Sequence, residues 1–184
     1  MKIKRYLSIF FMIVFCFLMQ TTVLSHFKLT NIIPNLLVIM TSASGFMFGR
    51  RYGMFAGVIC GGLMDLIYGD VVGVCIFIFV LIGFLNGLAN KYYFKDDLSI
   101  PLSAMGLSDL VFGMLYYICN FLLCGRLDFL AYVKDIMIPE MIYTILFGVI
   151  LYKFLYWLDD KLYPPEEIPL LTRFPFFSPE NRNI

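Results

Sequence analysis

The chain has 184 residues, of which 61% are apolar, 18% aromatic and only 15% charged, and its mean hydropathy is +0.85. This composition lies outside the range of soluble domains and predicts an integral membrane protein. A net charge of +1, without a dense basic tract, excludes a surface that tracks the phosphates of nucleic acid. The five cysteines fall in apolar runs without C-x-x-C spacing, so we predict buried apolar side chains, no metal site and no cofactor.

Apolar runs that approach the length of a bilayer crossing recur along the chain. They predict an all-α fold, a compact bundle of six transmembrane helices, with spans at about residues 6–24, 32–48, 52–68, 71–90, 100–123 and 136–155. The first run is longer than the core of a signal peptide and has only a weak cleavage site, so we expect a retained helix. We assign 1–158 to the membrane domain and 159–184 to a proline-rich cytoplasmic tail.

Basic residues predict the orientation of these spans. If the N-terminus lies inside, the inner segments carry eleven of the 14 Lys and Arg residues, in keeping with the positive-inside rule. We therefore predict that both termini are inside. Arg50 and Arg51, between the second and third spans, act as a topology anchor in this interpretation, and contact with lipid headgroups or a cytoplasmic filament is the alternative.

The second span is predicted to carry Pro34 in its first turn, where helix amides lack internal partners. Asn35 beside it has a side chain suited to capping this helix or bridging to another. At the end of the third span, Gly69 and Asp70 have the chemistry of a turn.

The third span contains glycines every fourth residue, at Gly53, Gly57 and Gly61, followed by Asp65. Residues four apart share one face of a helix, so these four form one ridge. Interior glycine weakens a soluble helix, but in a membrane it permits close helix packing. The ridge either packs the protein's own bundle or docks a partner's helix. The fourth span repeats the spacing, with Gly83 and Gly87.

Three acids lie in or near the spans: Asp65, Asp109 and Glu140. A carboxyl inside a bilayer needs a partner, and no lysine or arginine lies within the apolar runs. We expect protonated carboxyls that bond to Asn86, Asn120, tyrosine hydroxyls or helix-end charges. For Asp65 and Asp109 a structural polar contact and a partner or ligand contact both remain open, whereas Glu140 is interpreted as part of a helix start.

No enzymatic signature occurs in the chain. It has no G-x-S-x-G motif and no phosphate-binding glycine loop, and its single histidine, His26, falls in a predicted outer loop. We therefore predict a protein that is not an enzyme. A small-molecule carrier is harder to exclude, because carriers use membrane acids and broken helices.

An ordered set of residues resembles the rod shape-determining protein MreD family. The resemblance covers about Gln20 to Gly87 and rests on Gln20, Pro34-Asn35-Leu36-Leu37, Gly49-Arg50-Arg51-Tyr52-Gly53, Gly57, Gly61-Gly62-Leu63, Asp65, Gly69-Asp70 and Gly73. Beyond the fourth span it rests on length and span count alone. Asp109 and the tail therefore gain no functional assignment from it.

The resemblance implies a non-enzymatic protein of the bacterial inner membrane, in the complex that inserts side-wall peptidoglycan under the direction of MreB. The implied partners are MreC, the SEDS glycosyltransferase and its class B penicillin-binding transpeptidase. The family is also similar in architecture to the substrate-binding subunits of energy-coupling-factor transporters. A substrate-binding subunit or small carrier is thus the alternative, and it requires a polar cavity lined by Asp65 or Asp109.

Overall fold

The computed structural model describes residues 2–24, 33–68, 72–92, 99–119 and 129–162, and within these ranges every element is helical. The elements are α1 (Lys2–Leu18), the π-helical turn η1 (Met19–Leu24), α2 (Leu36–Phe48), α3 (Arg50–Tyr68), α4 (Val74–Leu88), the 3-10 turn η2 (Ala89–Tyr92), α5 (Ser99–Tyr117), α6 (Phe129–Tyr132), the π-helical turn η4 (Val133–Met137) and α7 (Ile138–Leu162). The π-helical turn η1 continues α1, and the 3-10 turn η2 continues α4. In the same way α6, η4 and α7 follow one another without a break. The elements therefore form six long helical segments, the predicted number.

Four of these segments are long and apolar enough to cross a bilayer: Lys4–Val23, Val74–Lys91, Ser99–Tyr117 and Val133–Lys161. Helix α2 is apolar but has only 13 residues. Helix α3 has 19 residues, and its charges and glycines lower its hydropathy. Length and composition thus make the chain a multi-pass membrane protein.

Several predicted boundaries need correction. Helix α2 begins at Leu36 and has Asn35 as its N-cap, so Pro34 precedes the helix and is not in its first turn. Residues 129–135, predicted to lie in a loop, are helical. At the other end α7 continues to Leu162, past the predicted start of the tail at 159.

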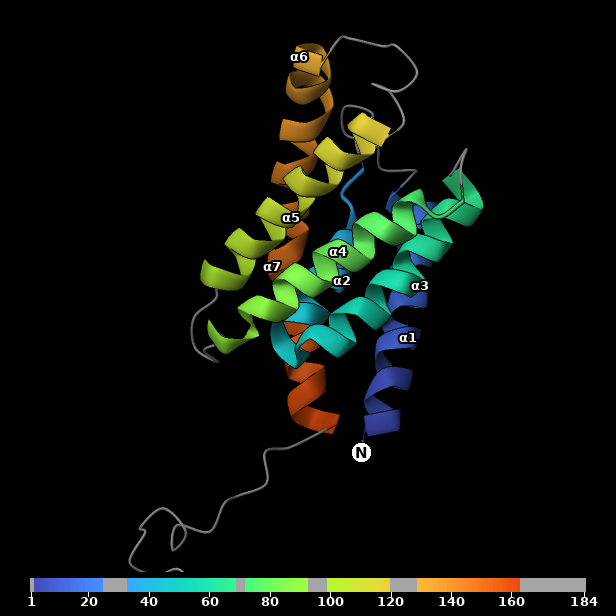
Figure 1. Cartoon of the computed structure of the whole chain (residues 1–184). Helices are drawn as coiled ribbons and strands as arrows, with labels where there is room; N and C mark the ends of the chain where they lie inside the picture. Colours follow the sequence, from blue (N-terminus) through green and yellow to red (C-terminus); the bar gives the residue numbers. More distant parts are fainter. Residues whose placement is uncertain (1, 25–32, 69–71, 93–98, 120–128, 163–184) are drawn as a thin grey trace, which may run out of the picture. The chain divides into compact units, whose positions relative to one another are not determined.

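Helix α2 is the central helix of the bundle. Its residues Leu36–Met47 are all buried, and in Figure 1 it lies behind α4. It contacts α1, α3, α4 and α5. At 1.5 Å per residue, 13 residues span about 20 Å, less than the roughly 30 Å of a hydrocarbon core. At least one end of so short a helix lies within the thickness of the membrane. The N-terminal end of α2 is buried at Asn35 and Leu36, so its amides need partners from the protein.

The chain divides into two compact units, Met1–Tyr152 and Lys153–Ile184. The first holds all the helix contacts described below. In the described part of the second, the rings of Phe154 and Trp157 stack with centroids 6.0 Å apart, and the Lys161 ammonium lies 4.9 Å from the Trp157 ring.

Candidate functional site

The glycine ridge of α3 lies against the backbone of α4. A Cβ atom built on Gly57 would lie 2.6 Å from the carbonyl oxygen of Phe79, and one on Gly61 would lie 2.6 Å from the amide nitrogen of Ile76. Both distances are shorter than a side-chain atom tolerates, so the helices approach this closely only because Cβ atoms are absent. Ridge positions four residues apart on α3 therefore contact positions about four residues apart on α4, and the two helices run in opposite directions along this contact.

Glycines on α2 and α4 complete this contact. A Cβ on Gly53 would lie 2.7 Å from the Cα of Gly45 on α2, and it would also clash with the carbonyl of Gly83 on α4. A Cβ on Gly45 would lie 2.7 Å from the same carbonyl oxygen. Three helices therefore meet where three glycines coincide. Of the two predicted alternatives for the ridge, this geometry favours packing within the bundle.

Asp65 binds the N-terminus of α4. It is 2% exposed, and its carboxylate oxygens accept hydrogen bonds from the backbone N–H groups of Gly73 at 2.7 Å, Cys75 at 3.0 Å and Ile76 at 3.2 Å. The first amides of a helix lack internal acceptors and carry its positive dipole end, so a carboxylate is well placed here.

This arrangement corrects the predicted environment of Asp65. The hydrogen bonds to its carboxylate come from backbone amides of α4, and the side chain of Asn86 bonds elsewhere. Asn120 lies outside the described residues. Both carboxylate oxygens act as acceptors, as in the ionised form, whereas we expected a protonated group. For Asp65 the geometry favours a structural polar contact between α3 and α4.

Two glycines of the resemblance set occupy positions that other residues rarely adopt. Gly49, between α2 and α3, has φ +91° and donates its N–H to the carbonyl of Gly45 at 2.8 Å. Gly73, before α4, has φ +111°. Left-handed backbone of this kind favours glycine. Gly69 and Asp70, the predicted turn, lie outside the described residues.

Polar side chains from distant segments bind the N-terminus of α2. Gln20 Oε1 accepts from the N–H of Leu36 at 3.0 Å, and Asn35 Oδ1 accepts from the N–H of Val38 at 3.2 Å. The N–H of Asn35 donates to Thr144 Oγ1 on α7 at 3.2 Å. The amides at this buried helix end thus obtain partners from η1, from the N-cap Asn35 and from α7.

We predict that Asn35→Ala destabilises the protein by about 1 to 2 kcal/mol, because the cap is lost where no water replaces it. The thermal unfolding midpoint of purified protein in detergent measures this. Ser103→Ala is the matched control, since the exposed Ser103 hydroxyl donates to the carbonyl of Ile100 in its own helix. Equal midpoints for the two variants would contradict the prediction.

The opposite end and the middle of α2 are held by two asparagines of α4 and η2. Asn90 Nδ2 donates to the carbonyls of Phe46 at 2.6 Å and Met47 at 3.1 Å. Asn86 accepts from the Ser42 hydroxyl at 3.0 Å and donates to Ser108 Oγ at 2.7 Å. Sequence reasoning did not assign these contacts. Their one signal was the spacing of four that places both asparagines on one helix face.

Asp109 lies on α5, is 5% exposed and faces α7. It is hydrogen-bonded to Thr144, and Glu140 is close enough for the two carboxyl charges to interact. Its Oδ1 has no hydrogen-bond partner among the described residues. Glu140 lies in the first turn of α7, as the prediction of a helix start has it, but α6 and η4 run continuously into α7, so eleven helical residues from Phe129 to Pro139 precede it.

One cavity of about 170 Å³ lies between α4 and α5. Its lining is mostly apolar, and its polar members, Asn86 and Ser108, already bond to each other. Neither Asp65 nor Asp109 lines it, although the carrier alternative requires one of them. Within the described residues, no group of three or more His, Cys, Asp or Glu side chains is placed to hold a metal ion.

A family model described as rod shape-determining protein MreD matches residues 1–162. The chain belongs to the MreD family. MreD is a membrane protein of rod shape determination, and the match includes every described helix. No curated protein and no solved structure matches the chain. The residues that carried the resemblance to MreD lie mainly at the joints of α2, α3 and α4: Gln20, Asn35, Gly49, Gly53, Gly57, Gly61, Asp65 and Gly73.

Proposed function

We propose that this MreD-family protein is a non-enzymatic component of the bacterial elongation machinery, located in the inner membrane with both termini inside. It helps to assemble or regulate side-wall peptidoglycan synthesis together with MreC, the SEDS glycosyltransferase and the class B penicillin-binding transpeptidase, and indirectly with MreB. The observation that supports this most is the family match over residues 1–162.

Partner contacts in this proposal use the outward faces of the bundle, since the glycine ridge is occupied by α4. The outward face of α7 carries large apolar side chains every fourth residue: Ile138, Ile142, Leu146 and Ile150. Helix α1 carries a comparable set: Leu7, Phe11, Phe15 and Leu18. When a partner helix packs on such a face, apolar side chains leave contact with lipid for contact with protein, and the hydrophobic free energy changes little. Shape complementarity between the helices therefore decides which partner binds.

The proposal is preferred to a carrier or substrate-binding subunit. A carrier needs a polar cavity at membrane depth, and the cavity between α4 and α5 is mainly apolar. Asp65 is engaged by three backbone amides of α4 and has little capacity left for a substrate. These contacts support a filled bundle whose work is done through neighbouring proteins.

Depletion of the protein in its source cell tests the proposal. We expect rod-shaped cells to become spherical while nutrient uptake stays normal, because side-wall insertion fails and septal synthesis continues. A plasmid copy of the chain restores rods. Cells that stay rod-shaped, and instead lose uptake of one nutrient, would contradict the proposal and support the carrier alternative.

A further inference from the structure

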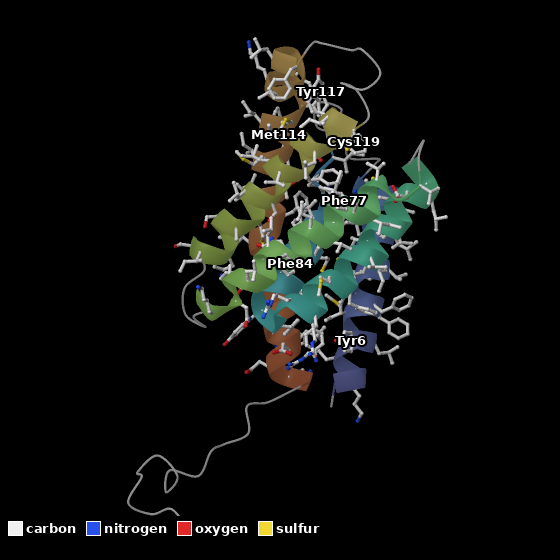
Figure 2. All side chains as sticks on the ribbon, viewed as in Figure 1. Tyr6, Phe77, Phe84, Met114, Tyr117 and Cys119 are labelled. Carbon is white, nitrogen blue, oxygen red and sulfur yellow. The ribbon has the colours of Figure 1, made fainter. Side chains whose placement is uncertain are left out.

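The cavity between α4 and α5 is an elongated slot that runs along both helices. Its lining has the same spacing on each side, with later positions three, four and seven residues after the first: Ile82, Leu85, Asn86 and Ala89 on α4 and the start of η2, and Ala104, Leu107, Ser108 and Val111 on α5. Seven residues at 1.5 Å each make the slot about 10 Å long. Phe84 of α4 and Met114 of α5, labelled in Figure 2, mark the two helices beside it.

The slot opens toward the surface of the bundle. Ile82, Asn86 and Ser108 form its floor, since they are only 1%, 6% and 6% exposed. Leu85 and Leu107 form its rim and are 46% and 64% exposed. Helices α4 and α5 belong to segments that can cross a bilayer, so the medium at this rim is the hydrocarbon of the membrane. A ligand of the slot is therefore supplied by the lipid.

The polar atoms of the floor already have hydrogen-bond partners. The amide group of Asn86 donates to the carbonyl of Ile82 at 2.9 Å and to Ser108 Oγ at 2.7 Å. The amide oxygen accepts from the Ser42 hydroxyl at 3.0 Å, and the Ser108 hydroxyl donates to the carbonyl of Ala104 at 2.7 Å. A buried water needs about two to four polar partners, so the slot favours an apolar occupant.

The volume of the slot limits the occupant to a short segment of one chain. An engineered apolar cavity of about 150 Å³ in another protein stays dry and binds benzene, a molecule of six carbon atoms. The slot has a volume of about 170 Å³, so it accommodates roughly six carbons of a hydrocarbon chain. A partner's helix, about 10 Å or more in diameter with its side chains, cannot enter it.

Two alanines leave the space that forms the slot. Ala89 lies three residues after Asn86, and Ala104 lies four residues before Ser108, so each is about one turn from the hydrogen-bonded pair. Leucine has three more carbon atoms than alanine. A leucine at either position therefore fills about half of the slot.

We propose that the slot binds one acyl chain of a membrane phospholipid. The chain lies between α4 and α5, over the hydrogen bond from Asn86 to Ser108, and its dispersion contacts complete the packing of the two helices. The inference is independent of the proposed part in wall synthesis, because it is tested on the purified protein alone.

Photo-cross-linking in nanodiscs tests the proposal. The nanodiscs contain phosphatidylcholine with a diazirine in one acyl chain, and mass spectrometry locates the adducts after illumination. We expect adducts on Ile82 and Ser108 of the floor, although both side chains are buried. Ile78, equally buried one turn earlier on α4 and outside the slot, should stay unlabelled.

Ala104→Leu is expected to lower the floor adducts several-fold, because the larger side chain takes the place of the acyl chain. Adducts on Met114, which is 51% exposed on the same helix, stay unchanged. Gly62→Leu is the control, since it adds a leucine where a Cβ meets nothing within 4 Å, and it retains the floor adducts. If Ala104→Leu does not fold, Ala89→Leu replaces it.

Two results would overturn the proposal. The first is floor adducts in the parent protein no more frequent than those on Ile78, as expected if the slot is empty or takes water or a partner's side chain. The second is an equal number of floor adducts in the parent and in the folded alanine variant.

Discussion

Gly61→Ala is expected to destabilise the protein, whereas Gly62→Ala, one residue further on, is not. A Cβ at Gly61 meets the backbone of Ile76 at 2.6 Å, but a Cβ at Gly62 meets nothing within 4 Å. Both substitutions raise helix propensity equally, by about 1 kcal/mol, so their difference isolates the contact with α4. Backbone atoms of α4 cannot rotate away, and we expect a loss of about 2 to 4 kcal/mol.

Unfolding midpoints of the two variants in the same detergent measure this difference. For a chain of this size we expect Gly61→Ala to unfold roughly 5 to 15 °C below Gly62→Ala. Midpoints that agree within a degree or two would show that α3 and α4 do not pack as closely as described.

Asp65→Ala is expected to have an effect of similar size, for a different reason. The substitution leaves the amides of Gly73, Cys75 and Ile76 without their acceptor at the start of α4. Each amide without a partner in a low-dielectric setting costs about 1 to 3 kcal/mol, and partial relaxation reduces the sum to about 3 to 5 kcal/mol. Asp65→Asn keeps one acceptor oxygen, so its stability should lie between that of Asp65→Ala and that of the parent protein.

Folded yield in membranes and the unfolding midpoint both report this loss. Asp135→Asn is the matched control, because this acid of η4 is exposed. The order parent, Asp65→Asn, Asp65→Ala identifies hydrogen bonding as the cause. If Asp65→Asn were as stable as the parent, the carboxylate would not be needed at this helix end.

The number of helical segments and the face of the glycine ridge were predictable from the sequence. Span count follows from apolar runs, because a bilayer sets their length. Glycines at intervals of four define a helix face whatever that face contacts. The helix that packs against this face was not predictable, because the glycine ridge would pack equally well against α4 or against the helix of a partner.

The partners of the polar side chains were harder to predict than their positions. Asp65 bonds to backbone amides, which every residue except proline carries and which therefore leave no signal in the sequence. Thr144 reaches Asn35 across 109 residues, and only the folded chain brings them together. Residues 129–135 were predicted to lie in a loop between two apolar runs, yet Lys134 and Asp135 are exposed on a helix.

The replacement Gly57→Leu tests most directly whether the ridge closes the protein's own bundle. Leucine at this position meets the carbonyl of Phe79, so we expect the amount of folded protein in membranes to fall several-fold, whereas Gly62→Leu leaves it near the parent level. If the protein binds MreC as proposed, the amount of MreC that co-purifies with each remaining folded molecule should stay unchanged. A Gly57→Leu protein that folds as well as the parent but no longer co-purifies with MreC would contradict the account and assign the ridge to a partner.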